Sequence, residues 1–536
     1  NPNAKPLGAQ ISHMLKDRGV DVIFGIPGVH NQEMYRGIEE AGITHVLARH
    51  EQGAGFMADG YARATGGFGV CYVITGPGLC NIMTPLGQAY SGSVSVLTLS
   101  SCLDDVTRRK GQLHQMKDQE TAGATVCDWS ETAQDAATAY QLIDRALHDF
   151  ACGDPRPKHV SVPIAVLQGM ADPHGVAKES HSTMMPDPAG VHHTAQALRS
   201  AKKPLIVIGG GAMGLAGVDP ATNANRIAPL LAATGAASFC TFAGRGIVAL
   251  DYPLHFGPFL ARPDSARIAG EADLVLVLGS QLAEVDIWRE RLGHACEMIR
   301  VDTSDEALTA DVGATTNIRA ECAAFVDAVL LELGKDVQPS AWSADTIAKT
   351  RTKWRAEVDS EFPKVLPIMD VLRDAMPDDA MIYSDMTQLA YVAKETYELD
   401  APGLWHHPFG FGTLGYALPA AIGGKIAQGD KPVIAIAGDY GFHYTMQELG
   451  VAVELGLSLP IVLWDNSELK EIADSMRRVQ IAPNAVVARN PDFVALARAF
   501  GAHGVRPASL ADMQQEVQMA LARPGPTLIH VTPAAL

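Results

Sequence analysis

The chain has 536 residues, of which 47% are hydrophobic and 19% are charged, and its formal net charge at pH 7 is −18. This composition provides enough apolar residues for large cores and is unlike that of a disordered chain. A strongly acidic chain lacks the basic face that nucleic-acid phosphates require, so we expect no nucleic-acid partner. At about 100–200 residues per domain, the length predicts roughly three domains.

The eight cysteines are scattered, and no two of them form a Cys-x-x-Cys pair. The sequence therefore predicts neither a zinc knuckle nor a redox motif, and we expect reduced thiols in a cytoplasmic protein. No signal peptide is recognised. Residues 64–103 carry no charge, but Gly, Pro, Asn, Gln and Ser interrupt them, so a buried segment is expected there and not a membrane span.

Short apolar runs recur along the chain and alternate with helical patterns. Continuous Val, Ile and Leu runs of this kind indicate parallel strands covered on both faces, so we expect an α/β fold of doubly wound parallel sheets. The runs are Val20–Gly25, Val70–Thr75, Val94–Ser100, Leu205–Gly209, Leu274–Gly279, Met381–Ser384, Val433–Gly438 and Ile461–Trp464.

Two segments without periodicity, 171–190 and 334–345, are rich in Pro, Gly and Ser and predict linkers. They give three units of ordinary domain size. The predicted domains are 1–172, 190–335 and 360–536.

The third unit places oxygen-bearing side chains just beyond two apolar runs. Asp439 follows Gly438, and Asn466 follows about 30 residues later, which is the length of one strand–helix–strand unit. Such spacing brings two strand ends side by side. Mg²⁺ would there bridge a diphosphate to the two side chains, and a helix N-terminus would bind the diphosphate. The alternative is that Asp439 is only the N-cap of a helix at Phe442–Leu455.

This pattern resembles the diphosphate motif of thiamine diphosphate-dependent enzymes, specifically of the acetolactate synthase and pyruvate decarboxylase superfamily. The family motif opens Gly-Asp-Gly and closes Asn-Asn, whereas this chain has Gly438-Asp439-Tyr440-Gly441 and Asp465-Asn466. A tyrosine therefore replaces a glycine and an aspartate replaces an asparagine, while the ligating carboxylate and amide are retained. The resemblance implies that the metal ligands are Asp439, Asn466 and the backbone carbonyl of Glu468.

The first unit extends the resemblance. Arg49-His50-Glu51, followed by Ala54, Met57-Ala58 and Gly60-Tyr61-Ala62-Arg63, is similar to the family's Arg-His-Glu-x-x-Ala-x-x-Met-Ala-x-Gly-Tyr-Ala-Arg. A Phe-Gly-x-Pro-Gly stretch precedes it, and Thr75 to Asn81 matches Gly-Pro-Gly-x-x-Asn. The resemblance covers nearly the whole chain, with the motifs in the expected order.

In the family, a carboxylate at the position of Glu51 is hydrogen-bonded to the aminopyrimidine ring and favours its imino form. The imino nitrogen then takes the proton from the thiazolium carbon, so the protein tunes the electronics of the cofactor. The alternative is a solvated glutamate at a helix start. Leu414, in 411–423, matches the bulky apolar residue that bends the cofactor, and its alternative is ordinary core. By resemblance, the cofactor-binding residues are Pro27, Gly28, Glu51, Thr75, Asn81, Gly412, Thr413, Leu414, Gly438, Asp439, Tyr440, Gly441, Asn466, Glu468 and Leu469.

The central unit contains Gly209-Gly210-Gly211 and Gly214, a partial match to the dinucleotide pattern Gly-x-Gly-x-x-Gly. A glycine turn between a strand and a helix explains these residues better. The Arg-Phe-Asp-Asp-Arg stretch that accompanies FAD in acetolactate synthases is not matched, and residues 279–288 stand in its place. We therefore expect no functional FAD.

The resemblance also implies a reaction. Enzymes of the superfamily release carbon dioxide from a 2-oxo acid and leave a thiamine-bound enamine, which is protonated, oxidised or added to a second carbonyl. We expect decarboxylation of a 2-oxo acid, with acetolactate synthase-type carboligation as the alternative. A flavin or nicotinamide oxidoreductase would use the glycine segment of the central unit, but it leaves Glu51, Asp439 and Asn466 unexplained.

Pocket residues indicate the substrate. Acetolactate synthases commonly continue after the motif asparagine with Gly-Met, where this chain has Lys470-Glu471. Glu471 would relay a proton or pair with a cationic tail, and its alternative is a helix-surface glutamate. The Gly-Asp-Tyr-Gly-Phe loop and Glu471 are similar to those of 5-guanidino-2-oxopentanoate decarboxylases, so a basic tail is expected. Residues 111–119 match a pocket loop, or are only a polar loop. The candidate catalytic residues are Glu51, His114, Gln115 and Glu471.

In the family the site lies between the first unit of one subunit and the third unit of another. The resemblance therefore implies a homodimer or a homotetramer, with the sites at the subunit interface. The expected partners are a small 2-oxo acid, thiamine diphosphate and Mg²⁺, with no membrane.

Overall fold

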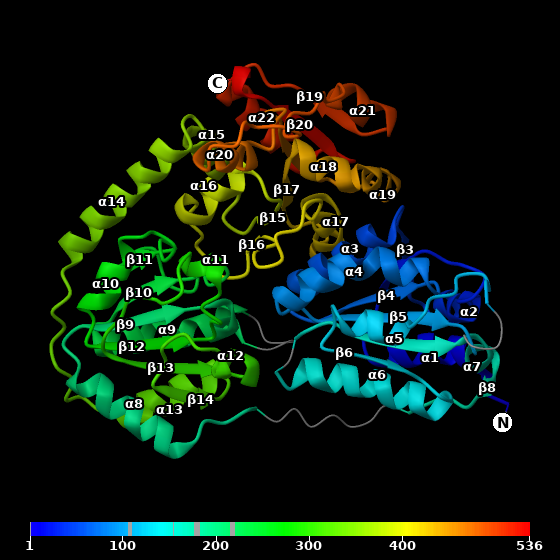
Figure 1. Ribbon diagram of the computed structural model, residues 1–536, viewed down its shortest axis with the longest axis horizontal. Helices are drawn as coiled ribbons and strands as arrows, with labels where there is room; N and C mark the ends of the chain where they lie inside the picture. Colours follow the sequence, from blue (N-terminus) through cyan, green and yellow to red (C-terminus); the bar gives the residue numbers. More distant parts are fainter. Residues whose placement is uncertain (1, 106–109, 154, 176–182, 215–219, 536) are drawn as a thin grey trace.

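The computed structural model describes residues 2–105, 110–153, 155–175, 183–214 and 220–535 (Figure 1). Within them lie three six-stranded sheets in which every strand pair is parallel, and helices flank each sheet. In each sheet the chain adds strands toward one edge and then returns to add the others toward the opposite edge, which is the doubly wound arrangement. The predicted α/β fold is confirmed.

The first sheet has the strand order β3-β2-β4-β5-β7-β6. Its strands are β2 (Val22–Gly25), β3 (Thr44–Leu47), β4 (Gly69–Val73), β5 (Val96–Cys102), β6 (Trp129–Thr132) and β7 (Lys158–Pro163). Its helices are α1 (Leu7–Asp17), α2 (Gln32–Ala41), α3 (Glu51–Thr65), α4 (Pro77–Ser91), α5 (Gln119–Ala124), α6 (Ala136–Ala151) and α7 (Ile164–Gln168). A short antiparallel pair, β1 (Lys5–Pro6) and β8 (Met170–Ala171), joins the two ends of this unit.

The central sheet has the strand order β11-β10-β9-β12-β13-β14. Its strands are β9 (Pro204–Ile208), β10 (Ala237–Cys240), β11 (His255–Gly257), β12 (Leu274–Leu278), β13 (Glu297–Asp302) and β14 (Thr316–Arg319). Its helices are α8 (Pro188–Ser200), η1 (Gly210–Met213), α9 (Pro220–Thr234), α10 (Ser265–Glu271), α11 (Glu284–Ile287), α12 (Asp305–Thr309) and α13 (Cys322–Leu333). The long helix α14 (Ala344–Glu361) then runs from the central unit to the third (Figure 1).

The third sheet has the strand order β16-β15-β17-β18-β20-β19. Its strands are β15 (Met381–Ser384), β16 (Trp405–His406), β17 (Val433–Gly438), β18 (Pro460–Trp464), β19 (His503–Val505) and β20 (Thr527–Val531). Its helices are α15 (Leu366–Ala375), α16 (Gln388–Thr396), α17 (Ala417–Gln428), α18 (Asp439–Thr445), η2 (Met446–Glu448), α19 (Leu449–Glu454), α20 (Lys470–Arg478), α21 (Phe493–Ala499), α22 (Leu510–Ala522) and η3 (Pro533–Ala535). No helix within the described ranges is both long and apolar enough to cross a membrane.

Every apolar run predicted to be a strand overlaps one. β9, β12, β17 and β18 consist wholly of buried residues, as expected for strands that are covered on both faces.

The helix predicted at 442–455 is wrong in its bounds. The segment forms α18 and α19, which are separated by the 3₁₀ turn η2, and α18 already begins at Asp439. Gly438 is the N-cap residue, and it makes no side-chain capping bond. The interpretation of Asp439 as an N-cap is therefore also wrong, because its backbone is already helical and its side chain is available for other contacts.

The first and third units meet where α3 crosses α17. A Cβ atom on Gly60 would lie 2.0 Å from the backbone oxygen of Ala420, and one on Gly423 would lie 1.9 Å from the oxygen of Met57. The two helix backbones therefore approach so closely that only glycine fits, and residues of both helices share one buried apolar cluster.

We predict that Gly60→Ala destabilises the protein by roughly 1–3 kcal/mol, because the added methyl forces two buried backbones apart. Alanine ordinarily favours a helix over glycine, so a loss here identifies the close crossing as the cause. Gly67→Ala is the control, since the nearest atom to its Cβ, Thr65 Oγ1, is 3.3 Å away. Thermal unfolding of both variants measures the effect, and equal midpoints would contradict the tight crossing.

Candidate functional site

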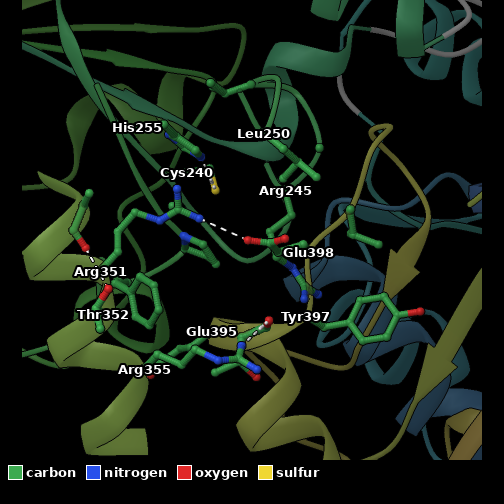
Figure 2. Close-up of a pocket in the computed structure, with 18 residues that line it drawn as sticks. Cys240, Arg245, Leu250, His255, Arg351, Thr352, Arg355, Glu395, Tyr397 and Glu398 are labelled. Carbon is green, nitrogen blue, oxygen red and sulfur yellow. Dashed lines mark hydrogen bonds and ion pairs between the residues drawn. The ribbon is translucent and has the colours of Figure 1, made fainter. Parts of the chain in front are cut away.

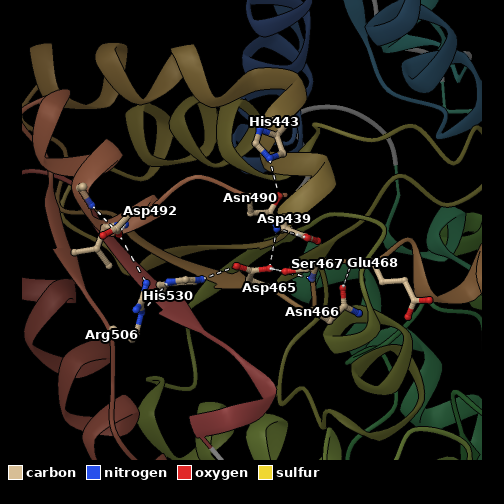
Figure 3. A network of polar contacts seen from close by, with 12 residues as sticks. Asp439, His443, Asp465, Asn466, Ser467, Glu468, Asn490, Asp492, Arg506 and His530 are labelled. Carbon is tan, nitrogen blue, oxygen red and sulfur yellow. Dashed lines mark hydrogen bonds and ion pairs between the residues drawn. The ribbon is translucent and has the colours of Figure 1, made fainter. Parts of the chain in front are cut away.

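The ends of β17 and β18 lie side by side because the two strands pair in parallel, with Gly438 opposite Trp464. Asp439 follows directly after β17, and Asp465 and Asn466 follow directly after β18. The structure thus brings Asp439 and Asn466 to one edge of the sheet, as their spacing predicted (Figure 3). At this edge the chain presents two carboxylates and an amide.

Asp439 is a buried carboxylate with 4% of its surface exposed. Its Oδ2 accepts a hydrogen bond from Asn490 Nδ2 at 2.7 Å, and the same nitrogen donates to Asp465 Oδ1 at 2.8 Å. Burial raises the pKa of Asp439, and the charge of Asp465 raises it further. A divalent cation would relieve the repulsion between two carboxylates that are buried this close together, so the residues present fit a metal bound to oxygen ligands.

Asp465 replaces the first asparagine of the motif, and hydrogen-bond donors stabilise its negative charge. Its Oδ2 accepts a hydrogen bond from His530 Nε2 at 2.9 Å. Burial acts to raise the pKa of Asp465, but hydrogen bonds from His530, Asn490 and Ser467 lower it to about 2. The sequence did not indicate His530 or Asn490, which come from β20 and from the loop before α21 (Figure 3).

Asn466 and Glu471 are linked through Gln388, the first residue of α16. Asn466 Nδ2 donates to Gln388 Oε1 at 3.1 Å, and Gln388 Nε2 donates to Glu471 Oε1 at 3.4 Å. The structure therefore connects Glu471 to the candidate metal ligand through Gln388, and the place of Glu471 near the cofactor stays a prediction. Sequence reasoning missed Gln388, although its place shortly after the predicted strand Met381–Ser384 is a usable signal.

Glu468 and Leu469 lie in the loop between β18 and α20. Asn466 Oδ1 accepts from the Glu468 N–H at 3.2 Å, and the Leu469 N–H donates to Val486 O at 2.7 Å. The Glu468 side chain forms an ion pair with Arg477 at 3.4 Å, and the ligand role of its backbone carbonyl stays a prediction. No three His, Cys, Asp or Glu side chains of the described chain could hold a metal, so such a site needs amide, backbone or phosphate oxygens.

The segment predicted to bend the cofactor is a tight loop before α17. Gly412 has a φ of +65° and Gly415 a φ of +88°, which are conformations that glycine adopts without strain. Between them Thr413 Oγ1 donates to the Leu414 carbonyl at 3.2 Å, and Leu414 is half-buried.

Asp385 joins this loop to the diphosphate motif. The Gly415 N–H donates to Asp385 Oδ2 at 2.9 Å, and a Cβ on Gly441 would lie 2.4 Å from the same oxygen. Burial raises the pKa of Asp385 to about 6. The close approach explains why position 441 needs a glycine, whereas Tyr440, which is half-buried, replaces the motif glycine.

Glu51 begins α3 and is 8% exposed. Its Oε2 accepts a hydrogen bond from Asn81 Nδ2 at 2.9 Å, and Asn81 comes from α4. Two predicted cofactor-binding residues from separate helices are thus in direct contact. The burial also argues against a solvated glutamate at a helix start.

The Thr75–Gly76 turn after β4 is fixed by a buried polar network. Thr75 Oγ1 lies 2.8 Å from Ser101 Oγ, and the Gly76 N–H donates to Gln119 Oε1 at 2.9 Å. Gln119 Nε2 in turn donates to the Ser101 carbonyl at 2.8 Å. Gln119 ends the segment 111–119 that was predicted to be a pocket loop, and it is the residue there that holds the turn.

Pro27 and Gly28 follow β2, the neighbour of β4 in the sheet, so this loop and the Thr75 turn share one edge. A Cβ on Gly28 would lie 1.8 Å from Ile74 Cδ1, and its N–H donates to Asn31 Oδ1 at 2.8 Å. Pro27 is exposed.

His114 and Gln115 are placed differently from each other. His114 has a φ of +63°, its carbonyl oxygen lies 2.3 Å from where a Gly76 Cβ would be, and its ring meets that of His30 with centroids 5.0 Å apart. Gln115 Oε1 accepts from the Gln112 N–H at 3.1 Å within its own loop. His114 therefore adjoins the Thr75–Gly76 turn, and their catalytic roles stay predictions.

Comparison with known proteins decides the family. A model of the N-terminal TPP binding domain of thiamine pyrophosphate enzymes matches residues 6–122, the central-domain model matches 191–329, and the C-terminal TPP binding domain model matches 385–531. The chain belongs to the thiamine pyrophosphate enzyme family. Thiamine pyrophosphate is another name for thiamine diphosphate, so the chain is an enzyme that depends on that cofactor.

Similar proteins divide between two activities. A probable 2-ketoarginine decarboxylase from Pseudomonas aeruginosa is 38% identical over 529 residues, which cover 98% of this chain and 93% of that protein. Two acetolactate synthase large subunits from Escherichia coli are less similar. Isozyme 2 is 29% identical over 98% of this chain and 95% of its own, and isozyme 3 is 28% identical over 95% and 90%.

The glycines of the central unit of this thiamine pyrophosphate enzyme have a structural explanation. The turn after β9 packs against the turn after β12, so that a Cβ on Gly209 would lie 2.2 Å from the Gly279 oxygen. Gly211 N donates to the same oxygen at 2.9 Å. This close contact is a structural reason for the glycines at these turns, and the expectation that the unit binds no dinucleotide stays a prediction.

A cavity of about 330 Å³ lies between the central unit, α14 and the segment after α16 (Figure 2). Two of the arginines that line it have partners there: Arg351 donates to Glu398 at 3.2 Å, and Arg355 donates to the Thr396 carbonyl at 3.1 Å. None of the predicted site residues lines this cavity, so it is separate from the candidate site.

Glu448 connects the third unit to the segment that carries Glu51. Its carboxylate oxygens lie 3.2 and 3.1 Å from the Arg49 N–H, which donates to them, and a Cβ on Gly53 would lie 2.3 Å from Oε1. Burial raises the pKa of Glu448 from 4.5 to about 7. The buried carboxylate of Glu448, from the third unit, therefore packs against the start of α3 in the first unit.

We predict that Glu448 makes folding pH-dependent. Because its pKa is higher in the folded state, its contribution to stability is full below pH 4.5 and is lost as the pH rises through about 7. Glu448→Gln removes this loss, so its stability relative to the natural protein should rise from pH 5 to pH 8, by up to about 3 kcal/mol. Thermal unfolding at each pH measures it, with the exposed Glu284→Gln as control. Parallel pH curves for all three proteins would refute the assignment.

Proposed function

We propose that the protein catalyses the thiamine diphosphate- and Mg²⁺-dependent decarboxylation of a 2-oxo acid, with 5-guanidino-2-oxopentanoate (2-ketoarginine) as the substrate. The observation that carries the proposal is the Asn466–Gln388–Glu471 linkage, which places an acid beside a candidate metal ligand. The similarity to a probable 2-ketoarginine decarboxylase supports it. When bound, thiamine diphosphate supplies the electron sink that the departure of carbon dioxide requires.

Glu51 would hold the pyrimidine end of the cofactor. Its buried carboxylate has one oxygen on Asn81, which fixes its orientation and leaves the other oxygen for a ring nitrogen. A carboxylate kept in a dry place interacts more strongly with a proton-bearing partner than one in water. At the opposite end, Asp439, Asn466 and the Glu468 carbonyl would hold Mg²⁺ and the diphosphate.

The surroundings of Glu471 carry both signs of charge. On α16, one turn beyond Tyr391, Lys394 lies with its ammonium 4.8 Å from the Phe242 ring centroid and 5.8 Å from that of Trp288. Burial lowers the pKa of Lys394, while the charges of nearby acids that include Glu471 act to raise it. A substrate with a carboxylate at one end and a guanidinium at the other complements this pair, with the carboxylate toward Lys394 and the tail toward Glu471.

We propose that a second copy of the chain completes the site, as a homodimer or a homotetramer. Large apolar side chains are exposed directly beside predicted site residues in both units: Val29, Leu113, Phe411 and Ile472. Apolar side chains grouped around a site are typical of an interface.

Glu51→Gln tests the proposed function. The purified protein is given thiamine diphosphate, Mg²⁺ and either pyruvate or 5-guanidino-2-oxopentanoate, and carbon dioxide and products are measured. We expect an aldehyde from the guanidino acid, with turnover at least about 100-fold lower in the variant because the carboxylate is lost. Glu39→Gln, at an exposed position of α2, is the control. Acetolactate from pyruvate would instead favour carboligation, and unchanged turnover in Glu51→Gln would refute the role of the carboxylate.

Glu471→Gln tests the substrate. We expect the KM for 5-guanidino-2-oxopentanoate to rise about 10-fold, since an ion pair is lost, while the KM for 2-oxopentanoate, whose tail carries no charge, stays the same. Steady-state kinetics with both acids give the comparison within one variant. An equal loss of turnover on both acids would show that Glu471 serves the chemistry and not the recognition of the tail.

A further inference from the structure

Asp465 has more hydrogen-bond donors around it than an asparagine could serve. Its Oδ1 accepts from the Ser467 N–H at 3.0 Å and from Asn490 Nδ2 at 2.8 Å, while its Oδ2 accepts from His530 Nε2 at 2.9 Å. An asparagine has one acceptor oxygen and would turn its NH₂ group toward one of these donors. The aspartate at this position is therefore matched to its surroundings.

The hydrogen on His530 can be placed from its partners. Arg506 Nε lies 3.2 Å from His530 Nδ1, and a guanidinium can only donate. Nδ1 is therefore the acceptor, and Nε2 carries the hydrogen that is donated to Asp465. The imidazole is 3% exposed, so water does not compete for these bonds.

Asn490 extends the same series of bonds to Asp439. Its Nδ2 donates to Asp465 and to Asp439, and its Oδ1 lies 3.1 Å from His443 Nε2 (Figure 3). The side chains of Arg506, His530, Asp465 and Asn490 thus form a continuous chain from the protein surface to the candidate metal ligand. We call these four residues the outer chain.

We propose that the outer chain forms the second layer of the divalent-cation site, where it orients Asp439 and adds a second negative charge beside the ion. This inference rests on the proposed Mg²⁺ requirement. Hydrogen-bond partners of a ligating side chain fix its direction, and their loss typically weakens metal binding by 10–100-fold. Asn490 links the two carboxylates, because it is the only described side chain that donates a hydrogen bond to both Asp439 and Asp465.

Direct binding of Mn²⁺, used as a paramagnetic substitute for Mg²⁺, tests the proposal. The full-length protein is saturated with thiamine diphosphate, and free Mn²⁺ is counted by electron paramagnetic resonance. We expect Asp465→Asn and Asn490→Ala each to raise the Kd for Mn²⁺ about 10-fold or more. Asp474→Asn is the matched control: it removes the same charge from neighbouring α20, where Asp474 pairs with Lys470 and Arg477, outside the outer chain.

The measurement does not depend on catalytic turnover, so it distinguishes a failure of the outer-chain proposal from a failure of the proposed metal requirement. If both outer-chain variants bind Mn²⁺ as tightly as the natural protein and Asp474→Asn do, the proposed role of the outer chain is refuted, while the metal requirement stands. If the natural protein does not bind Mn²⁺ in the presence of thiamine diphosphate, the metal requirement fails and the outer chain fails with it. Asn490 lies half-buried in a loop, so its variant keeps the test valid if Asp465→Asn does not fold.

Discussion

Parallel pairing between β17 and β18 is the constraint on which the candidate site depends. Since the two strands run in the same direction, their carboxyl ends fall at one edge, and Asp439 and Asn466 arrive together without a long loop. The first sheet repeats this geometry, because β2 and β4 pair in parallel and deliver Gly28 and Thr75 to a common edge. The short turns after these strands need glycine where other atoms come close, as Ile74 does at Gly28 and Asp385 does at Gly441.

Burial of acids at that edge has an energetic cost, which the surrounding donors offset. A buried carboxylate without partners would take up a proton, because the charged form is disfavoured away from water. Asp439, Asp465 and Asp385 are all buried, and the amide of Asn490, the imidazole of His530 and the N–H of Gly415 donate to them. The pKa directions follow from the balance between burial and these donors: hydrogen bonds from His530, Asn490 and Ser467 outweigh burial at Asp465, whose pKa falls, whereas burial outweighs the donors at Asp439 and Asp385, whose pKa values rise.

The sequence predicts local structure well, but it does not predict contacts between segments that are far apart in the chain. The strands were predictable because each is a continuous apolar run, and the meeting of Asp439 with Asn466 followed from the length of one strand–helix–strand unit. The helix after Asp439 was predicted with wrong bounds, since apolar periodicity continues across the 3₁₀ turn at Met446–Glu448 and hides the break. Gln388, Asn490 and His530 were missed because they reach the site from segments far apart in the chain, where no local period marks them.

The outer chain carries a positive charge at its exposed end and a negative charge at its buried end. Its positive end, Arg506, has a side chain that is 55% exposed, so solvent and salt screen the guanidinium. Its negative end, Asp465, is buried and hydrogen-bonded to a neutral imidazole, so its charge is little screened. The field at Asp439 is consequently governed by the near carboxylate and hardly by the distant cation. An asparagine at 465 would remove that field, which is a physical reason for the one motif position at which this chain carries an extra acid.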